Sequence, residues 1–169
     1  MMLTIQTFGL CERCAARMAY FFVNFAINTR SKGGNALRRS AYQRCSTSEN
    51  ALTDEAFDFS RKAEELAANG VLLPEGADPK FLDPNTLWQK VEAIEKRVNS
   101  QLARTMEISI PNEIPENLRD QFLIDMAQPF VERGFGVEWA RHNDDGIFQE
   151  VENPHGHFQI TMRPILGSE

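Results

Sequence analysis

The strongest constraint on the fold is a stretch of alternating residues close to the end of the sequence. Phe158, Ile160 and Met162 occupy every second position, which is the spacing of side chains on one face of a β-strand. His155 and His157 fall on the other set of positions, so both rings are expected on the opposite face, away from the hydrophobic core. The pattern therefore predicts a strand whose apolar face packs on helices.

Other patterns along the chain predict a mixture of strands and helices. Strands are expected at residues 19–28, 71–73, 105–111, 137–142 and 156–163, with a short one near 57–59, and helices at residues 35–45, 61–70, 83–98 and 115–133. The last helix should bury an apolar stripe of Leu118, Phe122, Met126 and Phe130. This order contains no internal repeat and favours an α+β fold with a largely antiparallel sheet and helices on one face.

The composition disfavours several classes of protein. No uninterrupted apolar run approaches the ~20 residues of a membrane span, so membrane insertion is not expected. The formal net charge of −6 counts against a generally basic nucleic-acid coat but leaves room for nucleic acid at a local patch. Cys11, Cys14 and Cys45 cannot all pair with one another, so a secreted disulfide framework is disfavoured and a cytoplasmic location is expected.

The length of 169 residues suits one domain. We expect this domain to span residues 18–169 and residues 1–17 to form a poorly ordered leader, with Met18 as an alternative start. The leader contains a Cys-x-x-Cys pair, but a zinc site needs four ligands. Two thiols without metal are therefore the simpler interpretation.

All three histidines lie between positions 142 and 157. His142 closes one predicted strand, while His155 and His157 share a face of the next, so the rings converge if the two strands pair. Three neutral imidazoles suit a divalent transition metal and leave positions open for a reactant. A single histidine on a strand is more often a surface or hydrogen-bonding residue, but three at ligand spacing favour a metal site.

Carboxylates near a metal hold its histidine ligands in one tautomer. Glu107 lies on the polar face of a predicted strand and is the best candidate, followed by Glu113 just after Pro111. Either residue is equally compatible with an exposed glutamate. Competing ligands occur in the loop before the last strand, where solvated charge is the simpler interpretation: Asp144, Asp145 and Glu152.

A basic segment without acidic residues lies between positions 28 and 48. Because the whole chain is acidic, this segment is one candidate surface for a phosphate backbone. A solvated basic helix face is an equally good interpretation of the charge alone. The basic residues are Arg30, Lys32, Arg38, Arg39 and Arg44.

Tyr42 lies inside this basic segment. A neutral phenol, with a pKa near 10, is a poor nucleophile. Beside a divalent cation and arginines it can react as phenolate and attack a phosphorus atom. On composition alone, a lone tyrosine is usually a structural residue, so its presence in this segment does not decide its role.

Together these segments resemble a known family. The stretches MAYFFVNFAINTRSKGGNALRRSAYQRC, DPNTLWQKVEAIEKRVNSQLARTMEISIPNEI, VEWARH and ENPHGHFQITMRP are similar to the nuclease domain of MobA/MobL relaxases. These are DNA-nicking enzymes of plasmid mobilisation in the His-hydrophobic-His (HUH) endonuclease superfamily. The resemblance covers about residues 18–165 and implies a relaxase/Rep-like nuclease fold, in which an antiparallel sheet of about five strands has helices packed mainly on one face.

The resemblance also implies a role for each candidate residue. Tyr42 is the nucleophile that forms a 5′-phosphotyrosyl link, and the three histidines hold a divalent ion, which is Mn, Mg, Zn, Co or Ni. Glu107 and Glu113 match carboxylates around the metal. The implied reaction is site- and strand-specific nicking and rejoining of single-stranded DNA at an origin of transfer, with relaxosome accessory proteins and a conjugative coupling protein as further partners.

Two other interpretations remain open. The chain ends at Glu169 without the usual C-terminal continuation, and Thr105 stands where many relatives have a glutamate. Both features favour a truncated, catalytically impaired remnant that binds DNA or metal. A cupin-like oxygenase also uses His-x-His, but it gives no role to Tyr42 and has a different sheet order.

Overall fold

The computed structural model describes residues 22–145 and 152–165. The strands are β1 (Val23–Thr29), β2 (Thr47–Asn50), β3 (Glu55–Asp58), β4 (Leu66–Leu72), β5 (Gln101–Ser109), β6 (Val137–Asp145) and β7 (Glu152–Thr161). The α-helices are α1 (Ala36–Gln43), α2 (Pro84–Ile94) and α3 (Glu116–Val131), and the 3-10 helices are η1 (Arg30–Lys32), η2 (Ser60–Glu65) and η3 (Pro79–Leu82). The leader, with Cys11, Cys14 and Met18, lies outside the described residues, as do the side chains of Asp144, Asp145 and Glu152.

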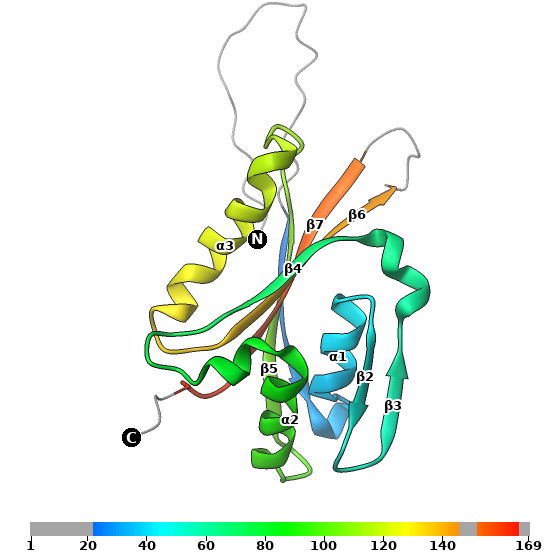
Figure 1. Ribbon diagram of the computed structural model, residues 1–169, viewed down its shortest axis with the longest axis vertical. Coiled ribbons are helices and arrows are strands. Elements are labelled where there is room, and N and C mark those ends of the chain that lie inside the picture. Colours follow the sequence, from blue (N-terminus) through cyan, green and yellow to red (C-terminus); the bar gives the residue numbers. More distant parts are fainter. Residues whose placement is uncertain (1–21, 146–151, 166–169) are drawn as a thin grey trace, which may run out of the picture.

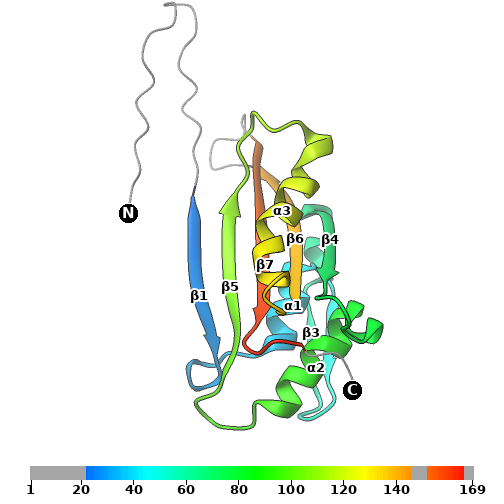
Figure 2. The ribbon, with the colours of Figure 1, turned by 90° about the vertical axis from the view of Figure 1, so that its left-hand side faces the viewer.

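The main sheet has five strands in the order β1-β5-β7-β6-β4. Every neighbouring pair is antiparallel, and Figure 2 shows the strands side by side in this order. β7 lies in the middle, between β5 and β6. The α+β fold with a five-stranded antiparallel sheet is therefore confirmed.

Helices cover both faces of this sheet. Figure 1 shows α3 on one face, and α1, α2 and the β2–β3 hairpin on the other. The prediction that helices pack mainly on one face is therefore correct only in number, because two α-helices lie on one face and one lies on the other. We call the two sides of the sheet the α3 face and the α1/α2 face.

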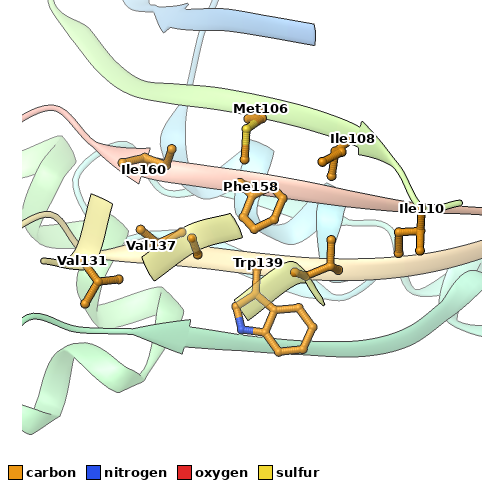
Figure 3. Packing of buried hydrophobic residues seen from close by; sticks show 10 residues of the cluster. Met106, Ile108, Ile110, Val131, Val137, Trp139, Phe158 and Ile160 are labelled. Carbon is orange, nitrogen blue, oxygen red and sulfur yellow. The ribbon is translucent and has the colours of Figure 1, made fainter. Parts of the chain in front are cut away.

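The α3 face carries the larger apolar core. Met106, Ile108, Phe158 and Ile160 alternate along β5 and β7 and are fully or almost fully buried, and Figure 3 shows them beside Val137 and Trp139 of β6. Their spacing is the period of two that a strand gives to one face. The alternation that predicted this strand therefore points its apolar side chains at α3, as expected.

The most deeply buried stripe of α3 lies one position later than predicted, although Phe122, Met126 and Phe130 do pack against the core. Leu118 is 50% exposed, and Phe122, Met126 and Phe130 are only partly buried. The buried residues follow each of these: Arg119, Leu123, Ala127 and Val131. The reason lies in β7, where a Cβ atom on Gly156 would come within 2.4 Å of Leu123 Cδ2. Because glycine has no side chain, the helix seats Leu123 directly on the strand.

The histidines lie on the face away from the Phe158 and Ile160 core, as predicted, but this α1/α2 face is also buried. Leu37 and Trp88 from the two helices form a second apolar cluster with Leu102 of β5. Beneath these helices, His142 is 4% and His157 is 5% exposed. The rings of His142 and His157 are therefore enclosed by α1 and its neighbours, whereas His155 is only partly buried.

Residues 46–73 differ most from the prediction. The structure has a β2–β3 hairpin followed by η2 and then β4, where we expected a loop with a short strand near 57–59, a helix over 61–70 and a strand over 71–73. The short strand overlaps β3, whereas the helix is absent from the described residues 61–70 as an α-helix. The Ala- and Glu-rich sequence favours helix by local propensity. Pairing with β6, which runs from Leu66 opposite His142 to Leu72 opposite Val137, overrides this preference because it completes the edge of the sheet.

Candidate active site

The sheet brings the three histidines together. His142 of β6 lies directly opposite His155 of β7, and His157 follows two positions later on the same face. The ring centroids are 4.8–5.4 Å apart. One nitrogen from each ring can be chosen so that all three lie within 4.8 Å of one another. This spacing allows one ion to contact all three rings.

Two of the rings are oriented by backbone carbonyls. Nε2 of His142 donates to the carbonyl oxygen of Gln43 at 2.6 Å, and Nδ1 of His155 donates to that of Asn153 at 3.0 Å. A carbonyl oxygen only accepts, so each of these nitrogens carries a proton, and in a neutral ring the other nitrogen is the one with the lone pair. Each ring is thereby held in one tautomer with a nitrogen that is able to bind a metal.

His157 is kept neutral by its surroundings. Burial, and then the neighbouring His155 and His142, lower the pKa of His157 to about 2. Its Nδ1 atom is buried and finds no hydrogen-bond partner among the described residues. A neutral ring with an unsatisfied buried nitrogen fits the donor set of a divalent transition metal.

Tyr42 lies next to these rings. Asn35 caps α1 by accepting a hydrogen bond from the Arg38 backbone, and the helix presents Tyr42 with its ring centroid 6.4 Å from that of His157. Two cations flank the tyrosine ring: the Arg39 guanidinium carbon at 5.6 Å and Lys62 Nζ at 5.8 Å from its centroid. Both distances are typical of cation–π contacts with the ring.

A cavity of about 400 Å³ joins these groups. It adjoins an open groove of about 530 Å³ that runs toward β1 and shares Arg39, Tyr42 and Glu107 with it. The cavity is lined by Phe22, Arg39, Tyr42, Lys62, Glu65, Glu107, Ser109, His142, Asn153, His155 and His157. An extended polymer in the groove would therefore pass Tyr42 on its way to the histidines.

The two candidate carboxylates have different positions. Glu107 pairs with His157 across β5 and β7, so its side chain emerges beside the histidine on the same face. Glu113 is exposed in the turn between β5 and α3 and does not line the cavity. It comes after Pro111, beyond the end of β5, and the structure therefore does not bring it to the site.

The basic residues also divide into two groups. Arg38 and Arg39 line the groove, and Lys32 is exposed on η1. Arg30 instead pairs with the buried Glu92 at 2.6 Å. Arg44 pairs with the buried Glu138 at 2.9 Å.

Both of these arginines are held by carboxylates from distant segments, so we assign Arg30 and Arg44 to the packing of the fold rather than to a DNA surface. A buried glutamate needs such a partner. The sequence alone did not show which arginines supply it.

Sequence reasoning missed Lys62, Glu65 and Ser109 of the cavity. Lys62 and Glu65 form an ion pair at 3.1 Å on η2, in a stretch that we predicted to be an α-helix. They reach the cavity only because the β2–β3 hairpin folds back over α1. No local signal in the sequence indicates that return.

No helix in the described part of the chain is long and apolar enough to cross a membrane.

Comparisons with known proteins agree with the resemblance. The MobA/MobL family model matches residues 35–169. The chain is 29% identical over 160 residues to the conjugal transfer protein TraA of Agrobacterium fabrum, covering 88% of this chain and 14% of that protein. It is also 29% identical over 149 residues to the probable mobilization protein MobA of Bifidobacterium longum, covering 88% of this chain and 26% of that protein. It therefore spans only a small part of these relatives.

A solved structure agrees at the level of the fold. The structure described as "Molecular Basis of Vancomycin Resistance Transfer in Staphylococcus aureus" has a TM-score of 0.78 and 31% sequence identity to this chain, and the match covers 86% of this chain and 71% of that one. The family model matches most of the sequence, and the sheet and helices described above are shared with this structure. The chain belongs to the MobA/MobL family.

Proposed function

We propose that this chain is the nuclease domain of a DNA relaxase, which nicks and rejoins one strand at a plasmid origin of transfer for conjugative mobilisation. The observation that carries the proposal is the position of Tyr42, whose ring lies 6.4 Å from His157 in the cavity of the three histidines. A nucleophile and a metal-binding group must lie this close if both are to act on one phosphate. The names of the relatives, which refer to conjugal transfer and mobilization, support the biological setting.

His142, His155 and His157 would hold a divalent ion, because all three offer imidazole nitrogens within 4.8 Å of one another, and Nδ1 of His157 is buried without a hydrogen-bond partner among the described residues. When bound, such an ion supplies Lewis-acid polarisation of the scissile phosphate. Imidazole ligands bind Mn, Co, Ni or Zn ions. Mg is the remaining candidate, although it is a hard cation that prefers oxygen ligands. Glu107 emerges beside His157 and is the carboxylate that we propose as a positioning residue for the metal-bound cluster.

The chain's own residues account for strand transfer. The proton of the Tyr42 hydroxyl leaves to solvent, and the cationic side chains of Arg39 and Lys62 lie beside the ring that then reacts. The phenolate oxygen bonds to phosphorus, the bond to the 3′ oxygen breaks, and that oxygen takes up a proton to leave as a 3′-hydroxyl. The phosphotyrosyl ester keeps the energy of the broken bond, so the 3′-hydroxyl can later reverse the reaction.

Single-stranded DNA is the proposed substrate. Arg38 and Arg39 line the groove next to Tyr42, where they can neutralise phosphates. Asn24 and Asn28 of β1 add side-chain amides along the same groove. A flexible single strand enters such a groove more readily than a duplex. Relaxosome accessory proteins and a coupling protein are the partners that this role requires.

A nicking assay tests the proposal directly. Supercoiled plasmid carrying the DNA that flanks the gene is incubated with protein and Mn²⁺, and the 5′ end is examined for covalently attached protein. Tyr42→Phe should lower nicking by at least about 1,000-fold, whereas Tyr20→Phe, at the only other tyrosine of the chain, should not change it. Undiminished nicking by Tyr42→Phe would refute the mechanism. A DNA mobility shift without cleavage by the unaltered protein would favour the impaired-remnant alternative.

A further inference from the structure

A second group of metal-ligating side chains adjoins the histidines. The thiol of Cys45, a carboxylate oxygen of Glu65 and a nitrogen of His142 lie within 4.8 Å of one another. The three residues come from separate segments, namely the end of α1, η2 and β6. The nuclease proposal assigns no role to Cys45 or Glu65, so their convergence on His142 requires its own explanation.

The donor set of this group differs from that of the histidine cluster. Cys45 is 4% exposed, and its Sγ atom lies 3.9 Å from Nε2 of His142. A thiolate, an imidazole and a carboxylate are three ligands of a tetrahedral Zn²⁺ or Co²⁺ site, with the fourth position left for water. The thiolate favours soft ions over Mg²⁺ or Mn²⁺. Three imidazole ligands alone discriminate less strongly between these ions.

Both groups use His142. A neutral imidazole has one lone pair, because its other nitrogen carries the proton. In the structure Nε2 donates to the Gln43 carbonyl at 2.6 Å, so the lone pair is on Nδ1. Binding at the Cys45 side requires Nε2 to give up this hydrogen bond and take the lone pair, and Nδ1 then carries the proton.

We propose that Cys45, Glu65 and His142 form a second metal position for thiophilic divalent ions, which is filled in competition with the three-histidine position. The Cys45 thiol loses its proton to solvent as the ion binds. Glu65 gives up its ion pair with Lys62 and binds the metal ion instead. The Lys62 side chain is 47% exposed, so its ammonium group can be solvated by water. The competition rests on the proposed function of the histidines, whereas the thiolate site itself does not.

Cobalt spectroscopy tests the site without an activity measurement. In the full chain with Cys11→Ser and Cys14→Ser, Cys45 is the remaining thiol of the three that the sequence contains. Anaerobic titration with Co²⁺ should give a saturable thiolate-to-cobalt charge-transfer absorption, and Zn²⁺ should abolish it. No such absorption from folded protein at saturating Co²⁺ would overturn the proposal.

Ligand variants then identify the partners of the thiol. Glu65→Gln and His142→Ala should each weaken cobalt binding at this absorption by at least tenfold. Cobalt binding that is unchanged in both variants would show that the thiol binds without them and would refute the site. Thermal unfolding of each variant confirms that the fold is kept.

The double variant His155→Ala/His157→Ala separates the two positions. It removes the three-histidine site but should keep the charge-transfer absorption, and loss of the absorption from folded protein would contradict an independent thiolate site. The Cys11→Ser/Cys14→Ser chain with its histidines intact should bind one tight ion, because His142 serves only one position at a time, and two tight ions would overturn the competition. The nicking assay is scored separately, so a failure of the proposed nuclease function leaves these outcomes readable.

Discussion

The two faces of the sheet are built on the same strands but are buried in different ways. On the α3 face, β7 contributes Phe158 and Ile160, which pack by apolar contact. On the α1/α2 face, the same strand contributes Gln159 and Thr161, both buried, next to His157. Apolar burial stabilises in proportion to area and needs little orientation, whereas each buried polar group needs a placed partner.

Glu138 shows how the polar face holds its helices. Its carboxylate accepts hydrogen bonds from Ser40 of α1 and Trp88 of α2 and pairs with Arg44. Complete burial raises the pKa of Glu138, although these three partners act to lower it. The helix that carries Tyr42 is therefore fastened to β6 by directional contacts, which fix its distance from the histidines more closely than apolar packing would. The comparison indicates that one face stabilises the fold and the other positions the site.

The largest predicted effect follows from removing a side chain from the α3 face. Phe158→Ala should lower the free energy of unfolding by about 3–5 kcal/mol, since it leaves a cavity in the fully buried core. Urea denaturation measures this change. Phe25→Ala is the matched control, because Phe25 is 62% exposed and its loss should change stability by less than about 0.5 kcal/mol. Equal effects of the two variants would show that burial in the α3-face core does not decide the stability.

Substitution of a histidine on the α1/α2 face should change metal binding strongly and stability little, which is the opposite of Phe158→Ala. His155→Ala should weaken Mn²⁺ binding by at least about 100-fold, because loss of a partner outside the ligand set alone costs 10–100-fold. His155 is only partly buried, at the outer side of the cluster, so the free energy of unfolding without metal should stay within about 0.5 kcal/mol. Calorimetric titration and urea denaturation give the two values. Unchanged Mn²⁺ affinity would remove His155 from the site.

These differences explain what the sequence could and could not predict. Strong alternation in residues 156–163 and the spacing of the histidines gave the central strand and its cluster, because both depend only on local geometry. The polar segment 46–73 has no such pattern, and its hairpin depends on contacts with α1 and β6. Arg44 could not be assigned, because its partner Glu138 is far away in sequence. The buried stripe of α3 could not be placed, because a glycine on β7 decides it.

That glycine supplies a smaller test of how the α3 face affects the site. Gly156→Ala would place a methyl group 2.4 Å from Leu123 Cδ2 in a core that has no space for it. We expect a loss of about 1–2 kcal/mol in the free energy of unfolding and weaker Mn²⁺ binding, because Gly156 separates His155 and His157. Combining it with Leu123→Ala should give less destabilisation than the sum of the two changes. Additive effects would show that Leu123 is not the obstacle.

The smallest effect concerns a charged cluster on the α3 side of the sheet. Glu116 and Asp120 of α3 accept hydrogen bonds from Arg141 at 2.8 and 2.6 Å, and the hydrogen bond from Arg141 lowers the pKa of Glu116 below its usual range. A carboxyl with a lowered folded-state pKa stabilises the protein above the unfolded value of about 4.3, and this contribution is lost as the pH falls through the folded value. Glu116 is 60% exposed, so solvent screens the pair.

Glu116→Gln should therefore lower the Tm by only about 1–2 °C at pH 7, and the difference should shrink as the pH falls below 4. Thermal unfolding across this pH range, with and without 1 M salt, provides the measurement. High salt should also reduce the difference at pH 7, because the pair lies at the surface. If the Tm difference between the two proteins grows as the pH falls, Glu116 stabilises the fold in its protonated form. The cluster would then resemble the buried polar groups of the α1/α2 face and not a surface ion pair.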